Sequence, residues 1–295
     1  MDKEGIAKWL IAVGKDGKIT RCKLKCDIYS NLTTKQVETI SLDDVEIIFS
    51  GIESPENQLK KNGLFLTLHC EAVVETDDID IAVSIFNHNL IAFFVLARAE
   101  FIVKEPIYKL VECNSEWIGI PGIHFEGAGY QDLGEGFINR HHSKLETLSR
   151  ARSGSNDIYK KLRKAMHLLR NAIELETLWP TESFLNYYKV IEIAADELKK
   201  NEYRNLIDSS TLVEDLVDLI ADNTQRLKVY FLYVVFKLTE FDKQKVISLG
   251  SARNRIAHSS YQPSREEMWL CKNVSFVVFS KLIEVVGLRV IQQNC

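Results

Sequence analysis

The first third of the chain is a series of short runs rich in β-branched and aromatic residues, a pattern typical of β-strands. These runs are KITRCKLKC, DVEIIFSG, GLFLTLHCEAVVET and IDIAVSIFN, and turn-forming clusters such as ESPEN and ETDD interrupt them. The next stretch, NLIAFFVLARAEFIV, is a continuous apolar run that suits a buried strand or a buried helix equally. The pattern therefore predicts an antiparallel sheet or sandwich in this part of the chain.

After ARSGSN at 151–156, which is typical of a linker, the apolar residues recur three and four positions apart, as on one face of an α-helix. The first such face contains Ile158, Leu162, Ala165, Met166, Leu169, Ala172 and Ile173. A second helix is predicted from Pro180, because proline is favoured in the first turn of a helix. Further helical segments are predicted at about 203–222, 224–239, 242–258 and 264–291. Short links between them predict an up-and-down bundle.

Residues 106–150 differ from both parts, since six of the fourteen glycines lie between Gly119 and Gly136. Their spacing matches neither GxGxxG nor a P-loop, so no phosphate-binding loop is predicted. An irregular connection between domains is the favoured interpretation, with a mobile recognition loop as the alternative. The sequence thus predicts an α+β fold, with a β-rich domain at 1–150 that includes this irregular region, and a helical bundle at 156–291.

Composition and charge narrow the class of protein. With 46% hydrophobic and 26% charged residues, the chain resembles soluble globular proteins. No apolar run reaches the roughly 20 residues that span a membrane, and the polar N-terminus predicts no secretory signal, so a cytoplasmic protein is expected. The six cysteines lack metal-site spacing, which predicts reduced, mostly buried thiols. Residues 151–295 contain 21 Lys and Arg against 18 Asp and Glu, so nucleic-acid binding through bulk charge is not indicated.

The stretch ARNRIAH, residues 252–258, interrupts the apolar pattern of its helix with polar side chains. At about 100° per residue, Arg253 falls in the middle of the apolar arc and Arg255 on the opposite side. Asn254 and His258 lie together on one shoulder of the arc. We therefore interpret Arg255 as a solvated surface residue. Arg253 needs polar partners, because a guanidinium directed into a bundle is costly when its donors are unpaired.

Two interpretations of Arg253 follow from the spacing alone. In the first, it forms a structural buried ion pair with Glu192, which lies on the shoulder of the apolar face of its own helix. In the second, the guanidinium binds an anion, and the small residues Gly250, Ala252 and Ala257 leave room for something to approach.

His258 occupies the last turn of the helix, where unpaired carbonyls favour a cation. It either caps the helix end or acts as a general acid and base. Arg253-Asn254-x-x-x-His258 matches the Rx4–6H motif of the HEPN superfamily, with asparagine directly after the arginine. The helix that contains SFLNYYKVIEIAADEL resembles the second helix of that family, and a long amphipathic helix follows the motif. The resemblance covers about residues 156–291 and does not extend to the N-terminal half.

The resemblance implies a metal-independent endoribonuclease that acts as a homodimer through its helical bundle and needs no cofactor. In this chemistry His258 would transfer protons and Arg253 would clamp the phosphate. Asn254 would orient the imidazole or the phosphate, with Glu192 in support. The basic residues Lys160, Lys161 and Lys164 are candidates for contacts with the RNA backbone, although a solvated basic face is the favoured interpretation.

Two related functions stay open on the sequence. The bundle could be a non-catalytic HEPN-like module that binds RNA or a protein, with Arg253 in a structural ion pair. Alternatively, the chain is a regulated effector of antiviral defence or of a toxin system, because HEPN nucleases often serve in such systems. In that case the β-rich half would recognise a ligand or a regulatory partner that controls the nuclease.

Overall fold

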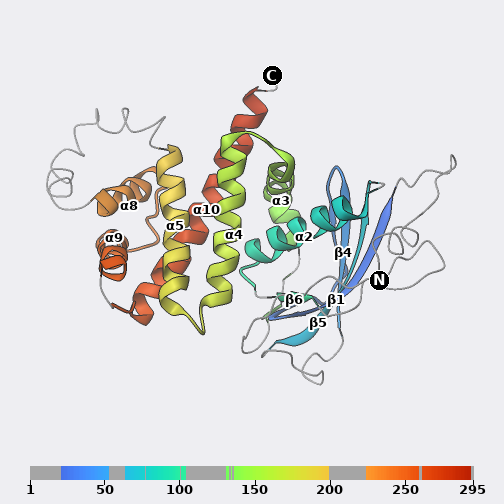
Figure 1. Cartoon of the computed structure of the whole chain (residues 1–295), viewed down its shortest axis with the longest axis horizontal. Coiled ribbons are helices and arrows are strands. Elements are labelled where there is room, and N and C mark those ends of the chain that lie inside the picture. Colours follow the sequence, from blue (N-terminus) through green and yellow to red (C-terminus); the bar gives the residue numbers. More distant parts are fainter. Residues whose placement is uncertain are drawn as a thin grey trace. The chain divides into compact units, whose positions relative to one another are not determined.

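The computed structural model describes residues 21–52, 64–76, 78–99, 101–103, 131–132, 134, 136–198, 224–258 and 261–293. The chain forms two compact units, unit 1 (Met1–Ser153) and unit 2 (Gly154–Cys295). In the described residues, unit 1 contains an antiparallel sheet and helices, whereas unit 2 is helical (Figure 1). The predicted α+β fold is therefore confirmed.

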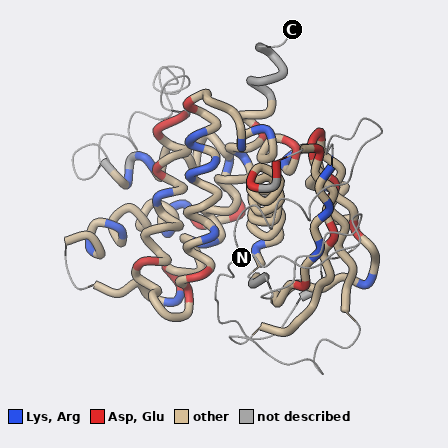
Figure 2. The backbone as a smooth tube through the Cα atoms, turned by 45° about the vertical axis from the view of Figure 1, so that its right-hand side comes forward, with Lys and Arg blue, Asp and Glu red and all other residues tan. Residues whose placement is uncertain are grey.

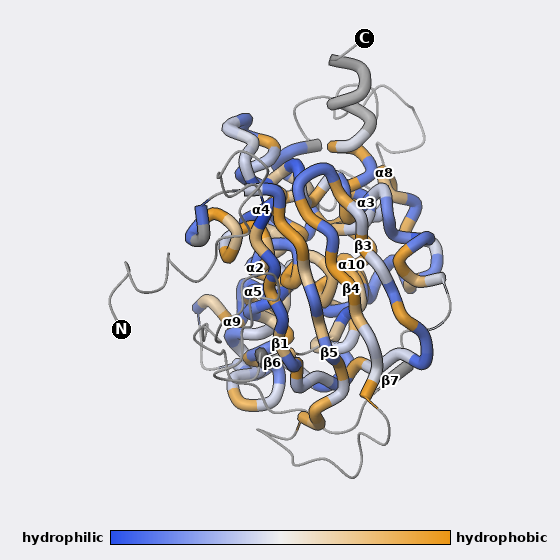
Figure 3. Tube along the Cα trace, turned by 90° about the vertical axis from the view of Figure 1, so that its right-hand side faces the viewer, coloured by the Kyte–Doolittle hydropathy of each residue, from blue (hydrophilic) through white to orange (hydrophobic). Residues whose placement is uncertain are grey.

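The sheet of unit 1 has five strands in the order β3-β4-β5-β1-β6, and every neighbouring pair is antiparallel. The strands are β1 (Cys22–Ser30), β3 (Glu38–Ser41), β4 (Val45–Gly51), β5 (Phe65–Val74) and β6 (Phe101–Val103). Along β1, buried and half-buried residues alternate without a break, as expected of a strand with one face on the core. Figure 3 shows the corresponding alternation of hydrophobic and hydrophilic residues along the strands. Two short strands, β2 (Leu32–Thr33) and β7 (Gln131–Asp132), pair in parallel.

The run IDIAVSIFN is the start of helix α2 (Ile79–Leu96), so the strand predicted there is wrong. Asp78 caps the helix by accepting a hydrogen bond from the Ile81 amide at 3.1 Å. The ambiguous apolar run that follows, NLIAFFVLARAEFIV, is part helix and part strand, since it contains the second half of α2 and then β6. Arg98, with a φ of 55°, lies between these two elements.

Helix α2 is buried on two sides, which explains why its pattern does not resemble an amphipathic helix. Its Phe93 ring stacks on Phe49 of β4, with ring centroids 4.4 Å apart. On another side, His88 Nε2 donates a hydrogen bond to the Leu148 carbonyl of helix α3 (Phe137–Ser153) at 2.8 Å. Because the sheet and α3 both cover α2, few positions are left for the polar residues that mark an exposed helix face.

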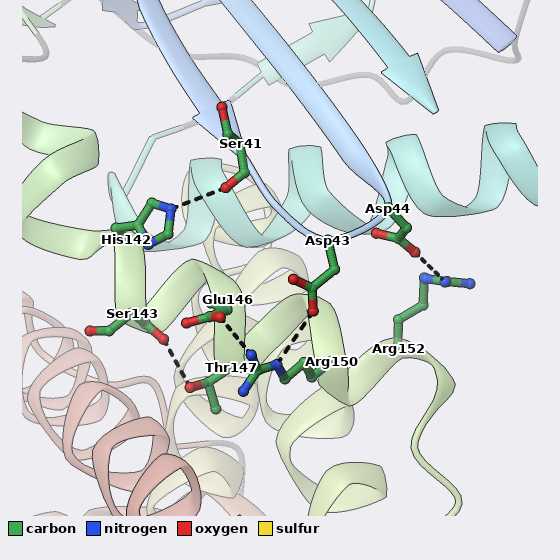
Figure 4. A network of polar contacts seen from close by, with 9 residues as sticks. All are labelled: Ser41, Asp43, Asp44, His142, Ser143, Glu146, Thr147, Arg150 and Arg152. Carbon is green, nitrogen blue, oxygen red and sulfur yellow. Dashed lines mark hydrogen bonds and ion pairs between the residues drawn. The ribbon is translucent and has the colours of Figure 1, made fainter. Parts of the chain in front are cut away.

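Polar contacts join α3 to the sheet at the turn between β3 and β4 (Figure 4). They link His142 with the Ser41 carbonyl at 3.0 Å, Arg152 with Asp44 at 2.8 Å and Arg150 with Asp43 at 3.8 Å. The irregular region predicted at 106–150 is therefore wrong for residues 137–150, which are helical. The rest of that region lies mostly outside the described residues.

Unit 2 contains five described helices in positions close to the predicted ones. They are α4 (Asp157–Leu175), α5 (Pro180–Leu198), α8 (Thr224–Val235), α9 (Lys243–His258) and α10 (Arg265–Gln293). Helix α4 begins at a cap in which Asn156 accepts a hydrogen bond from the Ile158 amide at 2.8 Å. Pro180 is the first residue of α5, as predicted. The helix predicted at about 203–222 lies outside the described residues.

The helices of unit 2 pack as a bundle in which α4 and α5 form an antiparallel pair and the long α10 crosses them (Figure 1). Helix α9 contacts α5, α8 and α10, and α8 also contacts α5. The large side chains Phe184, Tyr187, Tyr188 and Phe279 are fully buried between them. Helices α5, α8 and α10 thus pack against α9, the helix that contains ARNRIAH.

Two expectations from composition can be compared with the described residues. Cys22, Cys26, Cys70 and Cys271 are buried, as predicted. None of the described helices combines the length and the apolar character needed to cross a membrane.

Candidate functional site

Arg253 lies at the edge of the seam between α9 and α5 and is not buried in it. Its side chain is 29% exposed, and its Nη2 atom lies 3.6 Å from Oε1 of Glu192 on α5. The Glu192 side chain is 20% exposed. The position of Arg253 in the middle of the apolar arc thus predicted its direction toward α5 but overestimated its burial. A long arginine side chain can cover apolar surface with its stem while its charged end reaches the solvent boundary.

Asn254 contacts Arg253 and so belongs to the same cluster. The Nη1 atom of Arg253 donates a hydrogen bond to Oδ1 of Asn254 at 3.3 Å. The guanidinium is therefore held on two sides, by an amide from its own helix and by the Glu192 carboxylate from α5. Two such anchors restrict the orientation of a planar group, which prepares it to bind an anion at its remaining donors.

Tyr188 lies one turn before Glu192 on α5, and its hydroxyl responds to the same charges. Burial raises the pKa of Tyr188 well above its ordinary value, the charge of Glu192 raises it further, and the charge of Arg253 opposes this. The neutral hydroxyl donates to the carbonyl of Gln225, in the first turn of α8, at 3.3 Å. Tyr188 therefore connects the start of α8 to the helix that carries Glu192.

Gly250 allows α8 to approach α9 one turn before Arg253. A Cβ atom at this position would lie 2.6 Å from the Arg226 amide nitrogen and 2.7 Å from the Gln225 carbonyl carbon. Both contacts are with backbone, which cannot rotate away as a side chain can. The sequence suggested that Gly250 leaves room for a ligand to approach Arg253. In the structure, the first turn of α8 occupies this space.

His258 is the last residue of α9, and its side chain is exposed. Among the described residues, no hydrogen bond to its imidazole is found. It is five positions after Arg253, which corresponds to about 7.5 Å along the helix axis and about 140° around it. The two side chains of one chain therefore point to different sides of α9, and the structure does not bring them into one compact site.

Arg255 is exposed, as expected, but it is not simply a solvated residue. Its side chain is 52% exposed, its Nη2 lies 2.8 Å from Oε1 of Glu267 on α10, and its guanidinium lies 4.1 Å from the ring centroid of Tyr261. The Tyr261 hydroxyl donates to Oε2 of Glu267 at 2.7 Å. The amide of Ser264 donates to the same carboxylate at 2.8 Å, and Ser264 Oγ accepts from the Glu267 amide at 3.1 Å. We call these four residues the Arg255 cluster.

Part of the Arg255 cluster could have been found from the sequence. Ser264 and Glu267 form a capping box, in which a serine and a glutamate three residues later exchange hydrogen bonds at the start of a helix. The spacing S-x-x-E is visible in the printed sequence. The contacts of Arg255 and Tyr261 with this box depend on the angle at which α9 and α10 meet, which has no sequence signature.

The Glu267 carboxyl is stabilised in its charged form. Partial burial raises its pKa, but hydrogen bonds from Ser264 and Tyr261 and the charge of Arg255 outweigh this effect. The pKa of Glu267 is therefore lower than its ordinary value.

The three lysines of α4 that were considered for RNA binding differ in their surroundings. Lys161 Nζ lies 2.9 Å from Glu197 and 3.2 Å from Asp157, so its charge is locally compensated. Lys160 and Lys164 are exposed, and no acidic partner is found for them within the described part of the chain. Figure 2 shows that Lys and Arg positions are mixed with Asp and Glu positions along the backbone of the described helices. A broad basic surface is not formed by these residues.

Within the described ranges, no group of three or more His, Cys, Asp and Glu side chains is arranged to hold a metal ion. The adjacent histidines of α3 have other contacts, since His142 bonds the Ser41 carbonyl and the His141 ring packs on Phe137 with centroids 4.4 Å apart.

Replacing Gly250 with alanine is expected to destabilise unit 2 by about 1–2 kcal/mol, because the clash with the backbone of α8 exceeds the gain in helix propensity. Chemical denaturation followed by circular dichroism measures the effect. Ser251→Ala, at the next position of the same helix, is the matched control and should change stability by less than about 0.5 kcal/mol. Equal or higher stability of Gly250→Ala would show that α8 can move away from α9 without cost.

Glu267→Gln is expected to lower the free energy of unfolding at pH 7 by about 1 kcal/mol, because the charged acceptor of three hydrogen bonds is lost. Since the folded pKa of Glu267 lies below its unfolded value, this stability is present above about pH 4.3 and is lost as the pH falls through the folded pKa. Denaturation curves of both proteins should therefore converge once the pH is below the folded pKa of Glu267. If the wild type stays more stable than Glu267→Gln by the same amount at low pH, the charged form of Glu267 is not the source of the stability.

Comparison with protein-family models, with curated proteins and with solved structures found no match to this chain.

Proposed function

We propose that unit 2 is a HEPN-type endoribonuclease in which Arg253, Asn254 and His258 act on RNA without a metal ion. The observation that carries this proposal is the state of Arg253: its guanidinium is held by Asn254 and Glu192 while its side chain stays 29% exposed. A cation that is oriented by the protein and open to solvent suits binding of a phosphate. His258, exposed at the end of the same helix, supplies a group that can transfer protons.

The proposed reaction is attack of an RNA 2′-OH on the adjacent phosphorus. A base takes the 2′-hydroxyl proton as the new P–O bond forms, and an acid gives a proton to the departing 5′-oxygen as the old P–O bond breaks. The products are a 2′,3′-cyclic phosphate and a 5′-hydroxyl end, so no water or oxidant is consumed. His258 transfers the protons, and Arg253 stabilises the charge that develops on the nonbridging phosphate oxygens.

The separation of Arg253 and His258 around α9 supports a role for a second copy of the chain. Because one chain contributes one histidine from this motif, a two-fold dimer would bring a second histidine and a second arginine to a shared groove. The two exposed lysines of α4, Lys160 and Lys164, would contact the RNA backbone. Unit 1 would recognise a ligand or partner that regulates the nuclease, as in a defence or toxin effector.

Cleavage of a mixed RNA pool in EDTA tests the proposal. Wild-type protein is expected to cleave and to leave cyclic-phosphate ends, whereas Arg253→Ala and His258→Ala should lose at least about a hundredfold in rate. Arg265→Ala, which removes an exposed arginine at the start of α10, is the matched control and should retain activity. A requirement for Mg²⁺, or full activity of either site variant, would contradict the mechanism.

A second candidate function is a non-catalytic HEPN-like module that binds RNA or a protein. It is favoured by the Arg253–Glu192 contact at 3.6 Å, because two opposite charges on neighbouring helices can form a structural ion pair between α9 and α5. In this case Arg253 serves to hold the two helices together, and the loss of either partner should destabilise the bundle.

A double-mutant cycle of Arg253→Met and Glu192→Gln distinguishes the structural role. If the pair is structural, the cycle should give a coupling free energy of about 1 kcal/mol, at the upper end for a partly exposed pair. The measurement is chemical denaturation of the wild type, both single variants and the double variant. A coupling below about 0.3 kcal/mol would contradict the structural role and leave the guanidinium available for a ligand.

A further inference from the structure

The Arg255 cluster ties the last turn of α9 to the first turn of α10. Arg255 contributes from α9, Glu267 from α10, and Tyr261 from the segment between them. The Glu267 carboxylate contacts the side chains of Arg255 and Tyr261, since its Oε1 atom lies 2.8 Å from Arg255 Nη2 and its Oε2 atom accepts from Tyr261 at 2.7 Å. It also accepts a hydrogen bond from the amide of Ser264, the fourth member of the cluster. The Glu267 side chain is 18% exposed and is therefore the more buried of the two members of its ion pair with Arg255. The cluster is therefore a built polar junction and not a single surface ion pair.

Arg255 is closer to His258 along the helix surface than Arg253 is. Residues three apart on a helix are surface neighbours, with Cβ atoms about 5–6 Å apart, whereas residues five apart face different sides. His258 is also the last residue of α9, and the last turn of a helix frays unless other contacts hold it. The orientation of the His258 side chain thus depends on the contacts that hold the last turn of α9, which contains Arg255.

The guanidinium of Arg255 is suited to fixing this turn. One edge is bound to a carboxylate and one face lies on an aromatic ring, so the group is restricted in two directions at once. A lysine at the same position could keep the charge but could not reproduce the planar contact with Tyr261. The geometry thus assigns a task to this arginine that a generic surface cation would not perform.

We propose that Arg255, Tyr261 and Glu267 are positioning residues that hold the last turn of α9 and thereby orient His258 for proton transfer. This inference rests on the proposed ribonuclease function of the same helix. The cluster does not contact RNA in this scheme. It determines whether the imidazole is in place when the substrate binds.

A second ion pair between the same two helices offers a matched control. Lys245 Nζ lies 2.7 Å from Glu266 Oε1, and the two side chains are 61% and 68% exposed. This pair joins α9 to α10 near the opposite end of α9, far along the chain from His258. If any contact between α9 and α10 sufficed, removal of Lys245 would have the same effect as removal of Arg255.

Kinetic measurements on the full chain test the positioning role. Arg255→Met is expected to lower kcat about tenfold with KM changed by less than about twofold, because a misplaced proton-transfer group slows the chemical step without weakening RNA binding. Tyr261→Phe, which removes only a hydroxyl, should lower kcat by a smaller factor, and Arg255→Lys should recover part of the loss. Lys245→Met should leave both constants unchanged. Unchanged kcat in Arg255→Met, or a raised KM at constant kcat, would overturn the proposal.

Amide hydrogen exchange at residues 254–258 gives a readout that does not require cleavage. Arg255→Met is expected to accelerate exchange there about tenfold, and Lys245→Met is expected to leave it unchanged. If wild type fails to cleave RNA but Arg255→Met accelerates exchange, the ribonuclease proposal fails and the support of the last turn by the cluster stands. If exchange is the same in all three proteins, the cluster does not hold the turn and the positioning role is overturned.

Discussion

A guanidinium keeps its charge at any physiological pH, so it must be hydrated or paired wherever the fold places it. In unit 2 this constraint applies to Arg253, which lies at the edge of the seam between α9 and α5. The side chain meets both demands, since Glu192 and Asn254 bind it and 29% of it stays exposed. A fully buried arginine would need a complete set of partners, and a fully solvated one would not be held in one orientation. This intermediate arrangement leaves the guanidinium both oriented and open to solvent, as the proposed contact with an RNA phosphate would need.

The surroundings of Arg253 are built from contacts that a single helix could not provide. Gly250 lets the first turn of α8 lie against α9, and this turn presents the Gln225 carbonyl to the buried hydroxyl of Tyr188. Tyr188 precedes Glu192 by one turn of α5, so α8, α5 and α9 are joined through backbone and side-chain contacts around the arginine. The end of α9 has a separate support, the Arg255 cluster, which connects it to α10. The two ends of the ARNRIAH motif are therefore held by different helices.

The helices that bury only one face were predicted correctly from the sequence, whereas a helix that is buried on two sides was not. Helices α4 and α5 were found because each buries one face and exposes the other, and because Pro180 marks the first turn of α5. Helix α2 was mistaken for a strand at IDIAVSIFN, because the sheet and α3 both cover it and its polar positions are few. Helical periodicity is visible in a sequence only when one face is apolar and the other is polar. A helix that is buried on two sides has few polar positions, so its period is hard to recognise.

By itself, the sequence determined which residues of α9 carry the candidate chemistry and on which side of the helix each of them lies, because the angular spacing of a helix follows from its backbone geometry alone. The cap of α10 could have been read from the sequence too, since the capping box is a contact between residues three apart in the chain. Only the tertiary structure decided how deeply Arg253 is buried and that Arg255 belongs to a junction with Tyr261 and Glu267. Both outcomes depend on how far one helix lies from the next and at what angle, and those quantities come from the packing of the whole bundle.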